Sequence, residues 1–318
     1  MAAQPGGVDL VALEDVADDD SQTVDAVFIS RDITGLASKS QPSEALARCY
    51  RVIRRSPGLR WVHTHSAGAD RPIYGELMAR GVTVSTSSGA NARIVAHTAL
   101  AGVLALARRF PPLWAAQAAR RWASLAQEPL PRDLDGQTAV IVGWGPIGKA
   151  LQSMLAAVGL RCVIVRHRPE PAAPGLETVT YDALAQVLPR ADWLLLCCPL
   201  TARTRGLVDA AALRALPRGA HLVNVARGEV VVEADLVAAL QGGQLGGAFL
   251  DVFEHEPLAA DSPLWQLPGV MVTPHSAGLS DGNAARVATI FVDNLRRWLR
   301  HEPLRNAVST HPNGSLSC

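Results

Sequence analysis

Apolar and polar positions repeat with two different periods along the chain, and their order predicts an α/β fold. Short runs of strand-forming residues occur at 24–30, 59–65 and 82–86, and helical spacing of apolar residues occurs at 42–55 and 73–80. Proline or glycine stands at several of the breaks between them, as turns require. Strands that alternate with helices indicate a parallel sheet with crossover connections.

The longest helical pattern covers residues 91–110 and is apolar on most faces, which predicts a buried helix. Pro111 and Pro112 are expected to end it. The following segment, 114–131, is less regular and is expected to be an arm that packs on a partner subunit.

The alternation of strands and helices resumes more strongly at residue 138. Strands are expected at 138–142, 161–165, 192–198, 221–225, 246–252 and 270–273, and helices at 149–157, 181–188, 210–215 and 233–241. Six strands with crossovers match a complete doubly wound sheet. A final amphipathic helix is expected at 287–300.

A glycine-rich turn follows the first of these strands directly. Gly143, Gly145 and Gly148 have the spacing GxGxxG between a strand and a helix, which is the context of a dinucleotide-binding turn. Gly143 would permit the turn, Gly145 would let the backbone approach a pyrophosphate, and Gly148 would let helix and strand pack closely. The start of the helix, at Pro146 and Ile147, would offer its free N–H groups to the phosphates.

Other polar residues stand where the later strands end, and ligands of such sheets bind at that edge. These residues are Arg166, Pro199, Arg227, Asp251 and His275. At the end of the second strand, NAD-specific sheets usually carry an acid for the ribose 2′-hydroxyl. Here Arg166, His167 and Arg168 stand there, and such a cluster favours a 2′-phosphate. We therefore expect NADP(H) to be preferred, with NAD(H) and merely solvated charges as the alternatives.

Composition narrows the class of protein. With 30 Lys+Arg against 29 Asp+Glu, the net charge of +1 provides no general attraction to nucleic acid or to an anionic membrane. Apolar segments break before the ~18 residues of a membrane span. Five cysteines without a CxxC pair, and a start unlike a signal peptide, favour a cytoplasmic protein with reduced thiols.

Five stretches together resemble the D-isomer-specific 2-hydroxyacid dehydrogenases. They are GWGPIG (143–148), CPLTARTRGLVD (198–209), VNVARGEVV (223–231), GAFLDVFEHEPL (247–258) and TPHSAG (273–278). The resemblance implies two Rossmann-like doubly wound parallel-sheet domains with a cleft between them. The substrate domain would comprise 1–94 and 284–318, and the dinucleotide-binding domain 95–283.

The same resemblance places three catalytic residues at Arg227, Glu256 and His275. The guanidinium fork of Arg227 suits the carboxylate of a 2-keto acid. His275 is the expected general acid for the developing alkoxide, and Glu256 is expected to orient and charge its ring. Taken singly, each residue could instead be a surface charge, a turn residue or a structural histidine.

The remaining site residues follow from the matched motifs. The cofactor is expected at Pro146, Ile147, Pro199, Val225, Ala226, Arg227, Asp251, His275, Ala277 and Gly278, and the substrate at Ala67, Gly68, Arg227 and His275. His63 and His65 share one face of a strand without further metal ligands nearby, so no metal is expected. Their own role, and that of the acidic N-terminal segment, stays open.

The leading hypothesis is an NADPH-dependent reductase of a small 2-keto acid, of the glyoxylate/hydroxypyruvate type, that yields the D-2-hydroxy acid. The alternatives are an NAD-linked dehydrogenase of a bulkier acid and a nucleotide-sensing protein of the co-repressor kind. The resemblance also implies a homodimer. Trp122 would then either pack in the dimer interface or cap the partner's pocket.

Overall fold

The structure is a computed structural model that describes residues 8–16, 24–35, 42–126, 129–310 and 316–317. The chain divides into two compact units, residues 1–90 with 281–318, and residues 91–280. Both contain parallel sheets, so the expected α/β class is confirmed. Asp18, Asp19 and Asp20 of the acidic N-terminal segment lie outside the described residues.

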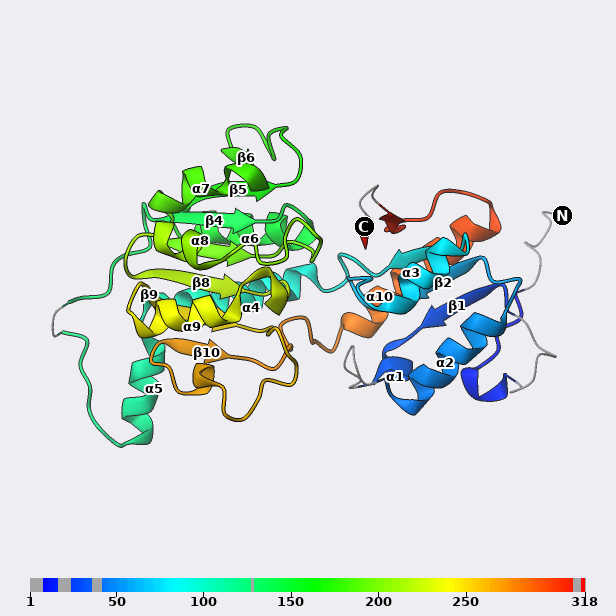
Figure 1. Cartoon of the computed structure of the whole chain (residues 1–318), viewed down its shortest axis with the longest axis horizontal. Helices are drawn as coiled ribbons and strands as arrows, with labels where there is room; N and C mark the ends of the chain where they lie inside the picture. Colours follow the sequence, from blue (N-terminus) through cyan, green and yellow to red (C-terminus); the bar gives the residue numbers. More distant parts are fainter. Residues whose placement is uncertain (1–7, 17–23, 36–41, 127–128, 311–315, 318) are drawn as a thin grey trace. The chain divides into compact units, whose positions relative to one another are not determined.

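The unit of residues 91–280 contains a seven-stranded parallel sheet in the order β10-β9-β8-β7-β4-β5-β6 (Figure 1). Its strands are β4 (Thr138–Val142), β5 (Arg161–Arg166), β6 (Thr178–Thr180), β7 (Trp193–Leu196), β8 (Ala220–Asn224), β9 (Leu245–Leu250) and β10 (Val270–Val272). The prediction of six strands missed β6. That strand has only three residues, lies at the edge of the sheet and is half-buried, so it leaves no apolar run in the sequence.

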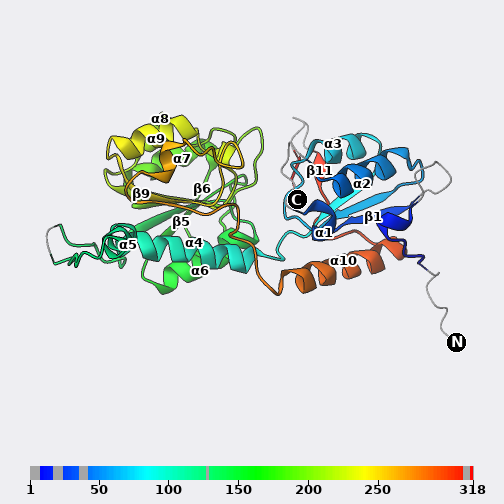
Figure 2. The same cartoon turned by 90° about the horizontal axis from the view of Figure 1, so that it is seen from below.

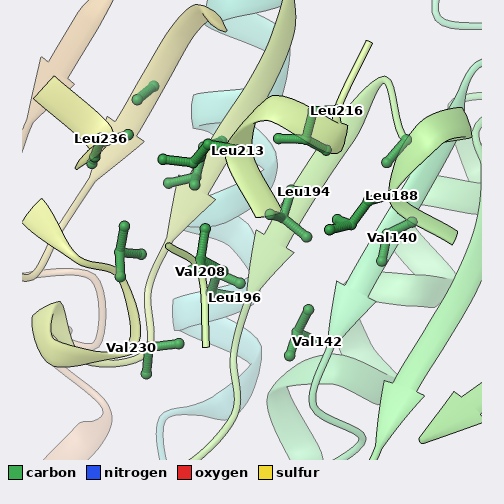
Figure 3. Packing of buried hydrophobic residues seen from close by; sticks show 14 of the residues in the cluster. Val140, Val142, Leu188, Leu194, Leu196, Val208, Leu213, Leu216, Val230 and Leu236 are labelled. Carbon is green, nitrogen blue, oxygen red and sulfur yellow. The ribbon is translucent and has the colours of Figure 1, made fainter. Parts of the chain in front are cut away.

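Helices cover both faces of this sheet (Figure 2). On one face lie α4 (Ala92–Ala107) and α6 (Pro146–Ala157), and on the other α7 (Leu184–Val187), α8 (Ala210–Ala215) and α9 (Glu233–Gln241). Successive strand residues serve opposite layers, since Val140 and Val142 pack toward α7–α9 (Figure 3) while Ala139 and Ile141 pack toward α4 and α6. Burial on both faces explains why the strands read as continuous apolar runs.

The expectation that Pro111 and Pro112 end a helix is wrong. Helix α4 ends earlier, and the two prolines lie in the first turn of α5 (Phe110–Ala118). Proline is tolerated there because first-turn N–H groups have no partner within the helix. The break comes instead at Arg109, whose φ of 54° is left-handed.

The other unit holds a three-stranded parallel sheet, β1-β2-β3. Its main elements are β1 (Ala26–Ile29), α1 (Arg31–Thr34), α2 (Glu44–Arg55), β2 (Trp61–Thr64), α3 (Pro72–Ala79), β3 (Thr83–Thr86) and α10 (Asn283–Leu299). Helices α2 and α3 cover one face, while α10 covers the other (Figure 2). The ring of Phe291 on α10 stacks on Phe28, with centroids 4.4 Å apart, so the end of the chain completes the unit formed by its beginning.

Short elements complete the description. They are the 3₁₀ helices η1 (Leu13–Asp15), η2 (Tyr181–Ala183), η3 (Leu188–Arg190), η4 (Gly228–Val230) and η5 (Pro263–Trp265), and the antiparallel pair β11 (Ser309–Thr310) and β12 (Leu316–Ser317). Among the described residues, none of the helices combines the length and apolar character that a membrane crossing demands.

Candidate active site

The strand order of the large sheet reverses between β4 and β7, and the glycine-rich turn leaves β4 at this point. Gly143 has a φ of 113°, and a Cβ built on it would come within 2.7 Å of the Cys198 backbone nitrogen. Its N–H donates to the Val165 carbonyl at 2.8 Å. Glycine is therefore required here by both conformation and space.

The other two glycines of the turn differ in what surrounds them. A Cβ on Gly148 would overlap the Gly143 carbonyl oxygen, so Gly148 is needed for α6 to pack on the turn. A Cβ on Gly145 would meet nothing within 4 Å. No neighbour in the described structure thus demands glycine at 145, whereas a pyrophosphate lying against the start of α6 would. The turn fits the phosphates of a dinucleotide.

A cluster of cations and an imidazole lies at the end of β5, the next strand. Arg166 is the last residue of β5, and His167 and Arg168 follow it on the surface. Arg203, from the loop after β7, donates from Nη1 to His167 Nδ1 at 2.9 Å and from Nη2 to Asp182 at 2.7 Å. Arg203 and Asp182 were not predicted as site residues from the sequence, because only the fold brings their segments to the end of β5.

The turn that carries Arg227 follows β8 and is held by Asn224. The Asn224 side chain is buried, accepts from the Ala226 N–H at 3.0 Å and donates to the Arg227 carbonyl at 3.0 Å. Arg227 itself donates from Nη1 to the Ala226 carbonyl at 2.7 Å. The sequence analysis missed Asn224, although an asparagine at the end of an apolar strand is a sign of such a side-chain-braced turn.

Gly228 connects this turn to the segment after β9. A Cβ on Gly228 would overlap the backbone of Phe253 and Glu254. In the same segment, the Glu256 Oε1 atom accepts from the Phe253 N–H at 3.2 Å. The segments that carry Arg227 and Glu256 are therefore packed backbone to backbone.

Asp251, the residue after β9, organises the loop that carries His275. Its buried carboxylate accepts from the Thr273 hydroxyl at 2.6 Å, the Ser276 N–H at 2.7 Å and the Ala277 N–H at 3.0 Å. Burial raises the pKa of Asp251, against the lowering effect of these hydrogen bonds. The described contacts of this carboxylate are with the loop, which the sequence analysis had not foreseen.

His275 and Glu256 form a hydrogen-bonded pair. The His275 Nδ1 atom lies 2.8 Å from Glu256 Oε2, and the imidazole side chain is 46% exposed. The backbone of His275 has a left-handed φ of 49°, and its N–H donates to the Asp251 carbonyl at 2.8 Å. Non-glycine residues in this conformation are strained and occur disproportionately at functional sites.

The remaining predicted cofactor residues have different exposures. Val225 and Ala226, which directly precede Arg227, are buried, and so is Ala277 in the His275 loop. Pro199 is exposed, and its carbonyl accepts from the Thr204 hydroxyl at 2.7 Å. Gly278 is crowded, because a Cβ there would meet the Asn91 side chain.

In the smaller unit, Ala67 and Gly68 lie in the loop after β2. The Ser66 hydroxyl donates to the Gly68 carbonyl at 2.7 Å. His63 is fully buried between Ser85 and Ser87, with ring nitrogens 2.8 and 3.0 Å from the two hydroxyls. His65 Nε2 lies 2.9 Å from the Thr34 hydroxyl. Within the described ranges, no three His, Cys, Asp or Glu residues are grouped as a metal site.

Comparison with known proteins gives a consistent picture. The family model of the NAD-binding domain of D-isomer-specific 2-hydroxyacid dehydrogenases matches residues 100–277. The (S)-sulfolactate dehydrogenase of Chromohalobacter salexigens is 33% identical over 301 residues, covering 92% of this chain and 96% of that protein. A glyoxylate/hydroxypyruvate reductase B of Klebsiella pneumoniae is 34% identical over 277 residues, covering 86% and 84%.

Among solved structures, a D-isomer-specific 2-hydroxyacid dehydrogenase of Xanthobacter autotrophicus Py2, in complex with NADPH and MES, superposes with a TM-score of 0.71. It is 36% identical, over 81% of this chain and 80% of that one. These matches confirm the resemblance seen in the motifs and favour an enzyme over a nucleotide sensor. This chain belongs to the D-isomer-specific 2-hydroxyacid dehydrogenase family and is a nicotinamide-dependent oxidoreductase.

Proposed function

We propose that this enzyme reduces small 2-keto acids of the glyoxylate and hydroxypyruvate type to D-2-hydroxy acids, with NADPH as the reductant. The observation that carries the proposal is the 2.8 Å hydrogen bond between His275 Nδ1 and Glu256. This bond orients the imidazole, which lies on the loop after β10. Arg227 and Asp251 follow the adjacent strands β8 and β9. The glyoxylate/hydroxypyruvate reductase among the relatives supports the substrate type.

Each protein group has a distinct task in this reaction. NADPH, when bound, supplies the hydride to the carbonyl carbon. Arg227 holds the substrate carboxylate and the neighbouring oxygen through its planar fork. His275 gives a proton to the oxygen that gains negative charge. Glu256 accepts a hydrogen bond from Nδ1 of His275, which leaves Nε2 as the proton donor.

The backbone N–H groups of Ala67 and Gly68 are assigned to the substrate carboxylate. Asp251 holds the loop of His275 in place through Thr273, Ser276 and Ala277. We propose that Asp251 acts on the bound cofactor through the position of this loop.

The preference for NADPH is supported at the end of β5. Arg166 occupies the place where NAD-specific sheets usually carry an acid, and His167 and Arg168 follow it. A carboxylate at this place would repel a 2′-phosphate, whereas a guanidinium binds one through charge-assisted hydrogen bonds. The related structure from Xanthobacter autotrophicus contains NADPH.

A second candidate substrate is a 2-keto acid with another anionic group, such as a sulfonate. Burial, together with the nearby charges of Arg31 and Arg71, lowers the pKa of His65 to about 4. Arg31 lies two residues after the end of β1, His65 directly follows β2, and Arg71 lies between β2 and α3. The positive charges of Arg31 and Arg71 near His65 favour a dianionic acid, as does the sulfolactate dehydrogenase among the relatives.

One experiment tests both candidates. NADPH and NADH oxidation is measured with glyoxylate, hydroxypyruvate, sulfopyruvate and phenylpyruvate, and kcat/KM is compared. We expect NADPH and the two smallest acids to give the highest values. Sulfopyruvate as the best substrate would favour the second candidate, and phenylpyruvate as the best substrate, or NADH as the better reductant, would contradict the proposal.

A further inference from the structure

We infer that Arg203, which lies outside the sequence motif for cofactor choice, completes the binding site for the 2′-phosphate of NADPH. The inference rests on the proposed NADPH preference and adds a specificity-determining residue from a different loop. Arg203 follows β7, whereas Arg166 ends β5 and His167 and Arg168 come directly after it.

The Arg203 loop is fixed independently of any ligand. The fully buried Thr204 donates from its hydroxyl to the Pro199 carbonyl at 2.7 Å, and this hydroxyl accepts from the Thr201 N–H at 2.8 Å. The Arg205 N–H donates to the Thr201 carbonyl at 3.0 Å. Arg203 therefore projects from a closed turn whose backbone position is set by the residues beside it.

The guanidinium of Arg203 is held on two sides at the end of β5. Asp182 accepts from Nη2 at 2.7 Å, and His167 Nδ1 accepts from Nη1 at 2.9 Å. Asp182 is correctly placed for this because β6, which ends two residues before it, pairs with β5 so that Thr180 lies beside Arg166. The same guanidinium lies over the ring of Tyr181, 5.9 Å from its centroid.

Both Arg203 and Arg166 act on Tyr181. Burial raises the pKa of the Tyr181 hydroxyl, and the charges of Arg203 and Arg166 oppose that rise. The two guanidinia, one at the end of β5 and one in the loop after β7, therefore both lie near Tyr181. This arrangement gathers positive charge at the place where the ribose of a bound dinucleotide ends.

The contact with Arg203 also sets the hydrogen-bonding state of His167. A guanidinium only donates, so Nδ1 of His167 must accept, and the ring hydrogen is then on Nε2. His167 is thereby presented as a donor at Nε2. Arg203 contributes its own charge and makes its neighbour a donor, and both properties suit a phosphate.

The test uses the full-length protein and two adenosine ligands that differ by one phosphate. Calorimetric titration with adenosine 2′,5′-bisphosphate and with 5′-AMP measures the contribution of the 2′-phosphate. Arg203→Gln should weaken the bisphosphate about tenfold or more, as expected for loss of charged hydrogen bonds, and leave 5′-AMP within about twofold. Arg203→Lys, which keeps the charge without the fork, should fall between.

Arg205→Gln is the matched control, because it removes an exposed positive charge two residues away on the same loop. It should change neither affinity. Equal weakening of both ligands by Arg203→Gln, or an effect of Arg205→Gln as large, would overturn the role of Arg203 while leaving NADPH preference intact. A wild-type protein that binds the two ligands equally well would instead reject the NADPH preference itself.

Discussion

The imidazole of His275 is the residue on which the proposed chemistry depends most directly. Its Nδ1 is committed to Glu256, so proton donation falls to Nε2. We expect His275→Gln to lower kcat for keto-acid reduction by about 10²–10⁴-fold, since general acid catalysis contributes that much. The Kd for NADPH, measured in parallel, separates this loss from any loss of cofactor binding.

We propose that Glu256 acts on the substrate through His275, so its variant separates positioning from catalysis. Glu256→Gln can still form a hydrogen bond to the ring but removes the negative charge. We expect a smaller loss of kcat than for His275→Gln, because the ring keeps a hydrogen-bond partner at Nδ1. If His275→Gln kept more than about a tenth of the activity, well short of the loss that general acid catalysis implies, the proposed role of His275 would be wrong.

His63 illustrates a buried histidine that serves the fold. Trp61 Nε1 donates to the Ser85 hydroxyl at 2.8 Å, Ser85 lies against Nδ1 of His63, and Ser87 donates to the Thr64 carbonyl at 3.1 Å. The hydrogen of the Ser87 hydroxyl is used at Thr64, so Ser87 accepts from Nε2 of His63. Nδ1 of the neutral ring then accepts from the Ser85 hydroxyl. Only the neutral imidazole fits this chain of donors and acceptors.

A pH dependence of stability follows from this burial. Desolvation lowers the pKa of His63 to about 4 in the folded protein, from an ordinary 6.5. The unfolded chain binds the proton first as pH falls, so stability is full above pH 6.5 and is lost toward pH 4. At pH 5 the loss from His63 is about 2 kcal/mol. Urea denaturation at pH 7 and pH 5 should show a smaller difference for His63→Gln than for wild type, and an unchanged difference would refute this.

At the scale of elements, two glycines of the turn between β4 and α6 are expected to differ in their roles. Gly148 is needed for folding, and Gly145 for cofactor binding. Gly148→Ala would drive a methyl group into the Gly143 carbonyl, and such overpacking costs about 1–3 kcal/mol. Gly145→Ala enters open space with an ordinary φ and costs less than about 1 kcal/mol as an N-cap change. Thermal unfolding without cofactor should therefore show a lower Tm for Gly148→Ala than for Gly145→Ala.

Cofactor titration completes this comparison. Gly145→Ala should weaken NADPH binding although the protein stays folded, because the added methyl group occupies the space assigned to the pyrophosphate. Wild-type affinity in Gly145→Ala would mean that the pyrophosphate lies elsewhere.

Regular elements could be predicted from sequence where the physical signal is local. The strand Thr138–Val142 was predicted with its observed bounds, because a buried run ends at a glycine that must turn. The edge strand β6 was missed because it is short and half-buried. Pro111 and Pro112 were misread because proline ends a helix in its interior but suits its first turn. Arg203 and Asp182 were missed because their proximity is created only by the order of strands.

At the scale of the whole molecule, the exposed aromatic side chains of residues 91–280 bear on assembly. Phe110 and Trp114 on α5 are 42% and 49% exposed and lie in contact, with ring centroids 5.7 Å apart. Trp265 and Trp122 are 51% and 97% exposed. Exposed apolar side chains that lie together on a surface, as Phe110 and Trp114 do, usually mark an interface. We therefore propose that the enzyme is a homodimer that uses α5 and the segment after it.

The mass in solution tests this assembly. Sedimentation equilibrium of the wild type should give twice the mass of the chain, and Trp114→Glu should shift the equilibrium toward the monomer. Val292→Glu is the control, since it places the same charge at a 39% exposed apolar position on α10. A monomeric wild type would contradict the proposal, as would equal dissociation of both variants.

Trp122 distinguishes two forms that such a dimer could take. If Trp122 only packs in the interface, Trp122→Ala should alter the dissociation constant of the dimer. The relative kcat/KM values for glyoxylate, hydroxypyruvate and phenylpyruvate should then stay unchanged. If Trp122 instead caps the partner's pocket, Trp122→Ala should raise kcat/KM for phenylpyruvate relative to kcat/KM for glyoxylate. We expect the first result, because dimer interfaces are enriched in exposed aromatic residues of this kind. A gain for phenylpyruvate that disappears when Trp114→Glu is added would show that Trp122 acts across the interface.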